Sequence, residues 1–371
     1  MHHSRKMWLS IALVLLALTT GCAERTATPG ASNEPTNNNG ITVTDALGRT
    51  VSWEAPPERI VIAGKANFFL NDAVYLFPQA PERVVALTSA QQTTAPFLAL
   101  LDPDYAEKVI FTPESTAEEI ATAQPDVVLL KRFMRESVGE PLETLGIPVV
   151  YLDLETPEQY QRDISVLGAV FGAPKRAQDV WDIYEAKMAA VEEGLADLDP
   201  ADRPTLLLLQ YNSRGAEIAL EVPPAGYIQT AMARIVQADT LWLNATSGGG
   251  WSVVNLEQIA TWNPDKIVII SYFDPVDEVV ARLTGDPNWQ GLAAVQNGEV
   301  YGFPVEYYSW DQPDTRWILG LTWLAKTVHP EQFSDLDMGE EIFEFYSDLY
   351  GLGADTVEAE IFPLLQGDVT P

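Results

Sequence analysis

The sequence predicts an α/β protein of two lobes, each containing a mostly parallel sheet flanked by helices. Three observations support this fold class: one nine-residue segment occurs twice, apolar strand-like runs alternate with helical segments, and a long amphipathic segment separates the two halves. Alternating strands and helices are typical of parallel sheets, because a parallel connection needs a crossover. The 371 residues, 47% of them hydrophobic, suffice for two or three units with real cores.

The repeated segment predicts the same helix, turn and strand in both halves. Residues 118–126 read EEIATAQPD and residues 257–265 read EQIATWNPD, so that six of nine positions are identical. Each copy precedes an apolar run, over residues 127–130 or 266–270. A short helix, a Pro-Asp turn and a buried strand are therefore expected twice.

Further apolar runs surround each copy and define the lobes. They cover residues 60–63, 83–87 and 146–151 in the first half, and residues 205–209 and 298–303 in the second. Short apolar runs between turn signals are typical of buried strands. We assign residues 41–155 to an N-terminal α/β lobe and residues 199–371 to a C-terminal α/β lobe.

The segment between the lobes, residues 156–198, is predicted to be a linking helix and the only crossing. Apolar residues spaced three and four apart recur from Val180 to Leu195, which is typical of an amphipathic helix. Residues 172–174 interrupt an earlier helical pattern, and the helix should end before Pro200. A single long helix predicts a stiff hinge.

The composition disfavours several classes of function. Lys and Arg number 22 against 53 Asp and Glu, a formal net charge of −31, which argues against nucleic acid and against adhesion of the folded body to anionic lipid. Only His329 lies outside the extreme N-terminus, so His-rich metal sites and His-dependent triads are disfavoured. The single Cys permits no internal disulfide. We expect neither a cofactor nor a resident metal.

The N-terminus is predicted to be an export signal with a lipid anchor. Arg5 and Lys6 precede an apolar run over residues 8–18, which is too short to span a bilayer. Residues 1–21 resemble a bacterial lipoprotein signal peptide, in which Cys22 becomes the lipidated first residue. An ordinary cleaved signal is the alternative. Residues 22–40, rich in Thr, Pro, Asn and Gly, predict a flexible tether.

Several segments together resemble one protein family. Residues 44–51 read TDALGRTV, residues 57–62 read PERIVI, and residues 309–317 read SWDQPDTRW. With the repeat and the linking helix, they are similar to the substrate-binding proteins of ABC importers for iron complexes and cobalamin, the helical-backbone type called class III. The resemblance covers roughly residues 41–350.

The resemblance implies a fold, a location and partners. It implies a ligand cleft between the lobes, a permease dimer with its ATPase as partners, and an anchored position on the outer face of the cytoplasmic membrane, on the periplasmic side where an outer membrane exists. We expect a monomer. The family includes binders of ferric siderophores, haem, cobalamin, and molybdate or tungstate.

Candidate ligand-binding residues follow the apolar runs, because open parallel sheets bind ligands beyond the carboxyl ends of their strands. Arg recognises oxyanions with a planar fork, and aromatic rings form flat walls for bulky ligands. The set therefore predicts an anionic ligand with apolar bulk; for each member the alternative is a surface ion pair or a place in the core. The candidates are Lys65, Asn67, Lys131, Arg132, Arg135, Tyr211, Arg214, Trp251, Tyr272, Tyr308, Trp310 and Arg316.

Glu118 and Glu257 occupy equivalent positions in the repeat, each at the start of a predicted helix. The resemblance implies that one Glu of each lobe docks with Arg pockets on the two permease subunits. The alternative is that both are simple helix-start acids, which the helix dipole favours. Glu119 could substitute for Glu118, whereas Glu257 is followed by Gln258.

We therefore expect an extracytoplasmic binding protein that captures a ferric siderophore or a related metal complex for import. Cobalamin, haem, and molybdate or tungstate are alternatives on the same fold. A secreted enzyme acting on carbohydrate is an alternative of another class. The sequence contains no nucleophile elbow, Walker A loop or dinucleotide-binding motif, and the candidate loops are basic and aromatic instead of doubly acidic.

Overall fold

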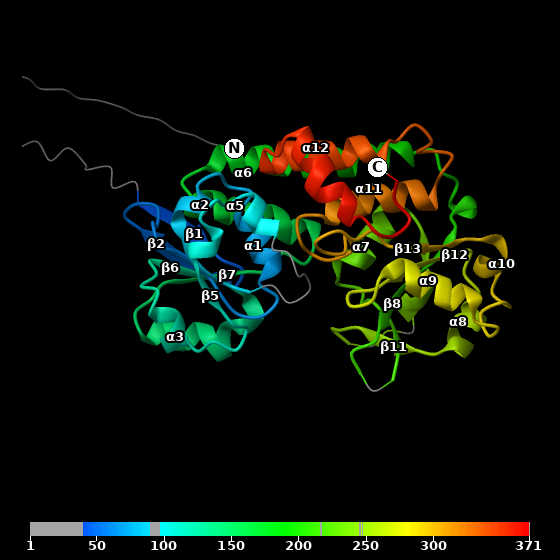
Figure 1. Cartoon of the computed structure of the whole chain (residues 1–371), viewed down its shortest axis with the longest axis horizontal. Coiled ribbons are helices and arrows are strands. Elements are labelled where there is room, and N and C mark those ends of the chain that lie inside the picture. Colours follow the sequence, from blue (N-terminus) through cyan, green and yellow to red (C-terminus); the bar gives the residue numbers. More distant parts are fainter. Residues whose placement is uncertain (1–39, 90–96, 216, 245, 247, 371) are drawn as a thin grey trace, which may run out of the picture. The chain divides into compact units, whose positions relative to one another are not determined.

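The computed structural model describes residues 40–370 apart from residues 90–96, 216, 245 and 247 (Figure 1). The predicted signal peptide, the predicted lipidation site Cys22 and the predicted tether up to residue 39 lie outside the described residues. Within the described ranges, every helix is too short or too polar to cross a membrane.

The first sheet contains five parallel strands in the order β5-β4-β3-β6-β7. Its central strands β3 and β6 are buried along their whole length, as expected for a sheet covered on both faces. The order reverses between β3 and β6, which makes their carboxyl ends a topological switch point. The strands are β3 (Ile60–Ile62), β4 (Val84–Thr88), β5 (Val109–Phe111), β6 (Val127–Lys131) and β7 (Val149–Leu152).

Short helices connect these strands, and an antiparallel hairpin precedes them. The helices are α1 (Phe68–Val74), α2 (Ala80–Arg83), α3 (Ala117–Ala121) and α4 (Glu140–Thr144). The hairpin pairs β1 (Ile41–Thr44) with β2 (Thr50–Trp53).

The second sheet contains six strands, and its parallel centre matches the prediction. The strands β10 and β12 pair parallel with β8, and β13 pairs parallel with β12. At one edge, β9 pairs antiparallel with both β8 and β11, so the sheet is mostly but not entirely parallel; both edge strands are short and partly exposed, so no buried apolar run marks them in the sequence. The strands are β8 (Thr205–Asn212), β9 (Ala219–Val222), β10 (Asp239–Thr240), β11 (Ser252–Val254), β12 (Lys266–Ile270) and β13 (Val300–Gly302).

The two copies of the repeat have the same structural role. Each forms a helix followed by a buried strand: α3 and β6 in the first sheet, and α8 (Leu256–Trp262) and β12 in the second. The Asp126 carboxylate accepts the backbone N–H of Arg59, just before β3, and the Asp265 carboxylate accepts the backbone N–H of Thr205, the first residue of β8. Each Pro-Asp turn therefore fastens its strand to the start of the neighbouring strand.

The predicted linking segment consists of two helices, of which one is the long helix. Helix α5 (Pro157–Val170) packs against β1, whereas α6 (Pro174–Gly194) continues for 21 residues and contacts α5, α7 (Ile228–Ile235) and α11 (Trp317–Val328). Gly172, with φ of +65°, lies in the turn between α5 and α6. The crossing is therefore α6, and α5 packs with the first lobe.

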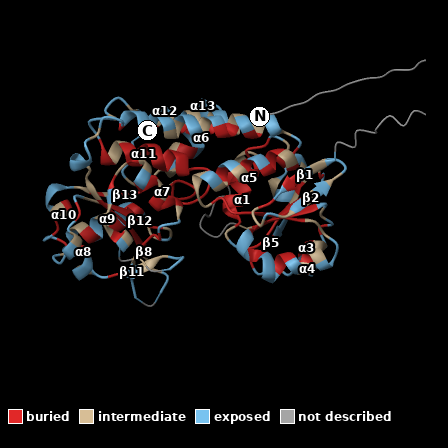
Figure 2. Cartoon of the chain, turned by 180° about the vertical axis from the view of Figure 1, so that it is seen from behind, coloured by how far each residue is buried: buried red, intermediate tan, exposed pale blue. Residues whose placement is uncertain are grey.

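The chain returns towards the first lobe near its end. Helix α12 (Met338–Tyr350) packs on α11, which is buried along most of its length (Figure 2). The guanidinium of Arg176 on α6 donates to the carbonyls of Leu76 and Leu349, and the Tyr350 hydroxyl donates to the carbonyl of Asp72 on α1. The remaining helices are α9 (Val276–Gly285), α10 (Ala293–Asn297) and α13 (Ala354–Thr356).

A buried charge cluster joins these segments. The Arg316 guanidinium is fully buried and pairs with Asp72 of α1 at 2.5 Å, with Asp314 at 3.0 Å, and with Glu306. The hydroxyl of Tyr346 on α12 also donates to Glu306. Three carboxylates surround one guanidinium, and burial raises the pKa of Asp72 to about 6 and that of Asp314 to about 8.

These raised pKa values predict that stability falls as the pH rises from about 4 to about 8. In that window the folded protein holds protons that the unfolded chain has released, so deprotonation favours unfolding. The variant Asp314→Asn should lose less stability than the unaltered chain between pH 5 and pH 8. Urea unfolding at pH 5 and at pH 8 measures the stability that each protein loses. We expect the two losses to differ by on the order of a few kcal/mol. Equal pH dependence of the two proteins would contradict the prediction.

Candidate functional site

Each sheet brings a cation and an aromatic ring to its switch point. In the first sheet, Lys65 follows β3 and Phe133 follows β6; in the second, Arg214 follows β8 and Phe273 follows β12. The strands β3 and β6 are neighbours, as are β8 and β12. The carboxyl edges of both sheets therefore present the same chemistry.

The backbone around Lys65 presents its side chain outward. Gly64 and Ala66 flank Lys65 with φ of +89° and +53°, both in the left-handed region. A non-glycine residue there costs free energy and is common in functional loops. Lys65 is exposed and forms no ion pair with any residue that the structure describes.

Lys65 and Phe133 line one pocket of about 500 Å³ at this switch point. Phe133 is 61% exposed, which is unusual for a ring of this size. The pocket extends to the start of α3, and its other lining residues are Pro113, Glu114, Ser115, Thr116, Ala117, Glu118, Met134, Ser137, Val138 and Pro141.

A row of aromatic rings lies at the edge of the second sheet. The Arg214 guanidinium lies over the Phe273 ring, 4.6 Å from its centroid. From Phe273 the row continues through Tyr272 and Trp251 to Tyr227, with each pair of centroids 6.4 Å apart and each pair of planes steeply inclined. Phe273 is 42% exposed, and Trp251 and Tyr227 are partly exposed. The row can offer ring faces and edges to a ligand, and Arg214 adds a positive charge.

A buried carboxylate, Asp311, is hydrogen-bonded to one ring of this row. Asp311 accepts hydrogen bonds from the Tyr272 hydroxyl at 2.7 Å and from the Gln229 amide at 2.9 Å. Burial raises the pKa of Asp311 to about 6, although these hydrogen bonds favour the ionised form. The Tyr272 hydroxyl is therefore committed to Asp311, which fixes the orientation of the ring.

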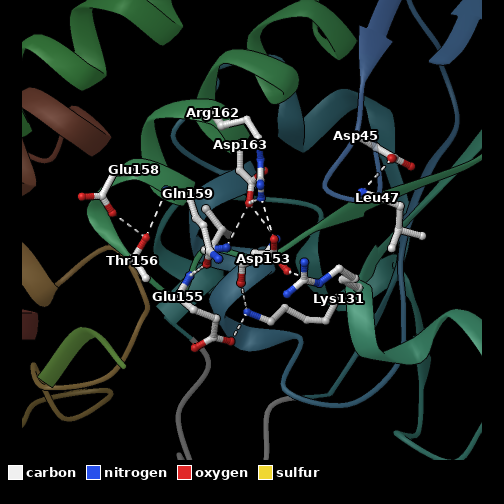
Figure 3. A network of polar contacts seen from close by, with 12 residues as sticks. Asp45, Leu47, Lys131, Asp153, Glu155, Thr156, Glu158, Gln159, Arg162 and Asp163 are labelled. Carbon is white, nitrogen blue, oxygen red and sulfur yellow. Dashed lines mark hydrogen bonds and ion pairs between the residues drawn. The ribbon is translucent and has the colours of Figure 1, made fainter. Parts of the chain in front are cut away.

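Three of the predicted basic residues are already paired with acids; Figure 3 shows the pairing of Lys131 with Glu155. Lys131 is buried and donates to the Asp153 carbonyl and to the Glu155 carboxylate, 2.6 Å away. Arg132 pairs with the Asp153 carboxylate at 2.9 Å. Arg135 pairs with Glu140 at 3.1 Å, with both side chains half-exposed.

The ion pairs around Asp153 and Glu155 balance in charge. Arg162 pairs with the Asp153 carboxylate at 2.8 Å and with that of Asp163 at 2.7 Å. Lys131, Arg132 and Arg162 supply three positive charges, and Asp153, Glu155 and Asp163 supply three negative ones. The network shapes the edge of the sheet but adds little net positive potential for an anion.

The other candidates lie in the interior. Asn67 donates to the Thr88 carbonyl, Tyr211 accepts from Arg282 at 2.6 Å, and Trp310 donates to Glu306. Tyr308 stacks on Phe68 with the centroids 4.6 Å apart. With Arg316 in the charge cluster, these positions favour structural roles. Within the described ranges, no cluster of His, Cys, Asp and Glu could hold a metal ion.

The two repeated glutamates, Glu118 and Glu257, take no part in the capping boxes of their helices. Thr116 and Glu119 form a reciprocal capping box at the start of α3, and Asn255 and Gln258 form the matching box at the start of α8. Glu118 and Glu257 lie between the capping residues, are exposed, and form no ion pair with a described residue. Glu119 is committed to the cap, so Glu118 is the available carboxylate of the first lobe.

Sequence reasoning missed Phe133, Phe273, Tyr227 and Asp311. Phe133 and Phe273 lie in the loops after β6 and β12, so the rule that selected Lys65 and Arg214 would have found them. Tyr227 precedes α7 and follows no strand, and Asp311 is buried in a long connection, so no local signal marks either residue.

Known proteins are similar to this chain both in part of its sequence and in its fold. The molybdate-binding protein MolA of Haemophilus influenzae is 29% identical over 102 residues, which are 27% of this chain and only 28% of MolA. A solved periplasmic solute binding protein from Veillonella parvula is 25% identical, with a TM-score of 0.71 over 87% of this chain and 97% of that one. The structure of MolA bound to molybdate, 20% identical, has a TM-score of 0.68 over 84% of this chain and 98% of that one. Residues 89–307, more than half of the chain, match the family described as periplasmic binding protein. The chain therefore belongs to the periplasmic binding protein family, whose structurally similar members are two-lobed solute-binding proteins of ABC transporters.

Proposed function

We propose that this protein captures an anionic metal chelate with apolar bulk, such as a ferric siderophore, and delivers it to the permease of an ABC importer. One observation carries the proposal: the switch point of each sheet presents an exposed phenylalanine beside a cation, Lys65 or Arg214, that forms no ion pair with the residues the structure describes. A ligand between the two edges would meet Lys65 and Phe133 on one side and Arg214 and Phe273 on the other.

The balance of charges and rings favours a chelate over a bare oxyanion. A small oxyanion needs several hydrogen-bond donors directed at one point, but Lys131, Arg132 and Arg135 are already paired with acids. The row from Tyr227 to Phe273 suits the apolar body of a larger ligand. Molybdate or tungstate is the second candidate, supported by the local identity to a molybdate-binding protein.

The ligand proposal predicts a dependence on the aromatic row. Calorimetric titration should show binding of ferric catecholate or hydroxamate complexes, and weaker or no binding of sodium molybdate. Trp251→Ala and Phe273→Ala should each weaken chelate binding by about tenfold, since each removes about 1–2 kcal/mol of ring contact. Phe343→Ala, which removes a 37% exposed ring from α12, is the matched control.

Two outcomes would separate the candidates. Tight binding of molybdate with no response to iron complexes, and with both ring variants unaffected, would replace the chelate by an oxyanion. Turnover of carbohydrate substrates would instead favour the alternative that the protein is an enzyme.

We also propose that Cys22 anchors the protein to the outer face of the cytoplasmic membrane. Mass spectrometry of the mature chain should show an N-terminal Cys22 carrying diacylglycerol, and Cys22→Ser should release the protein from the membrane fraction. One lipid chain binds a membrane only marginally, whereas two or more anchor it stably. A free Cys22 thiol in a soluble mature protein would show that the signal peptide is an ordinary cleaved one.

The docking proposal assigns Glu118 and Glu257 to the two permease subunits. The double variant Glu118→Ala/Glu257→Ala should reduce transport and stimulation of the ATPase by about tenfold or more, since each lost pair removes charge complementarity. Ligand affinity should change far less than transport. Glu185→Ala/Glu192→Ala, which removes two exposed acids from α6, is the matched control. Unaltered transport with both Glu118 and Glu257 removed would leave them as helix-start acids.

A further inference from the structure

The pocket at the switch point of the first sheet contains both Lys65, which the proposed function places at the ligand, and Glu118, which it places at the permease. Lys65 lines it from the loop after β3, whereas Glu114 and Glu118 line it from the segment after β5. All three side chains are exposed, and none forms an ion pair with a residue that the structure describes. Their charges are therefore available to any group that enters the pocket.

The size of the pocket makes these charges interact. A volume of about 500 Å³ corresponds to a width on the order of 10 Å, which is close to the Debye length of about 8 Å at physiological ionic strength. The positive potential of Lys65 therefore extends to Glu118 and weakens the attraction of that carboxylate for an approaching cation.

We propose that Lys65 makes docking with the permease depend on whether the ligand site is filled. The proposal rests on the proposed function, in which an anionic ligand reaches Lys65 and a permease arginine meets Glu118. In the empty protein, the Lys65 ammonium repels that arginine. A bound anion neutralises Lys65, so the loaded protein docks more tightly without any movement of the lobes. By linkage, docking strengthens ligand binding by the same factor.

The second lobe provides an internal comparison. Glu257 is the equivalent docking residue, but it belongs to α8 of the other lobe and does not line the pocket of Lys65. A coupling that acts through the shared pocket must therefore involve Glu118 and must leave Glu257 independent of Lys65.

The test measures docking of the ligand-free full chain with its permease complex in lipid nanodiscs. Lys65→Gln should bind about threefold more tightly than the unaltered chain, the factor expected for one charge about 10 Å away in a solvated site. Lys175→Gln, which removes an exposed lysine from α6, should have no effect. High salt should abolish the gain.

A double-mutant cycle then locates the effect. Lys65→Gln and Glu118→Gln should be non-additive, because the gain from removing Lys65 requires the Glu118 charge. Lys65→Gln and Glu257→Gln should be additive. Unchanged affinity of Lys65→Gln, or a gain that is the same in the Glu118→Gln background, would overturn the proposal.

The result also separates this inference from the proposed function. If Glu118→Gln/Glu257→Gln weakens docking but Lys65→Gln does not strengthen it, docking stands and the electrostatic coupling is wrong. If the double glutamate variant docks as well as the unaltered chain, the docking assignment itself fails.

Discussion

The packing of α1, α12 and the connection after β13 depends on the ion pairs of the buried Arg316 guanidinium. It binds Asp72 of the first lobe, Glu306 and Asp314 of the connection after β13, and through Glu306 it reaches Tyr346 of α12. The centroid of the Phe97 ring lies 4.5 Å from the guanidinium carbon, which adds a cation–π contact. Removal of either side of such a cluster leaves buried charges without partners, which is among the most destabilising changes available to a protein. The cluster thus joins a connection that has almost no regular secondary structure to α1 and to α12.

The placement of the carboxyl edges of the two sheets follows from a different constraint, the topology of the sheets. Because β3 and β6, and likewise β8 and β12, run parallel as neighbours, the loops after them must meet. The repeated Pro-Asp turns fix where β6 and β12 begin, and the lengths of these strands decide where Phe133 and Phe273 emerge. A pair of short sequence segments therefore determines the placement of chemistry in both lobes.

The sequence predicted the repeated units, the two mostly parallel sheets and the long helix, because each of these leaves a periodic pattern. Of the candidate site, Lys65, Arg214, Trp251 and Tyr272 lie at the two edges, but Tyr308, Trp310 and Arg316 lie in the interior. A polar or aromatic residue after a strand does not reveal whether its loop faces solvent. The connection that contains Arg316 is buried by α11 and α12, whose positions depend on contacts far away in the sequence. The charge balance of Lys131 with Glu155, 24 positions later, is equally invisible in a local pattern.

The return of α12 to α1 has a consequence for how the protein matures. The contact of Tyr350 with the Asp72 carbonyl, and that of Leu349 with Arg176, involve residues made late in synthesis. A chain that emerges from its N-terminus forms the first sheet early but cannot complete the buried surroundings of Asp72 until α12 is available. A first lobe with an uncompensated Asp72 remains incompletely packed, since a buried carboxylate needs its partner. The surroundings of Asp72 are therefore completed only when residues near the end of the chain have been made.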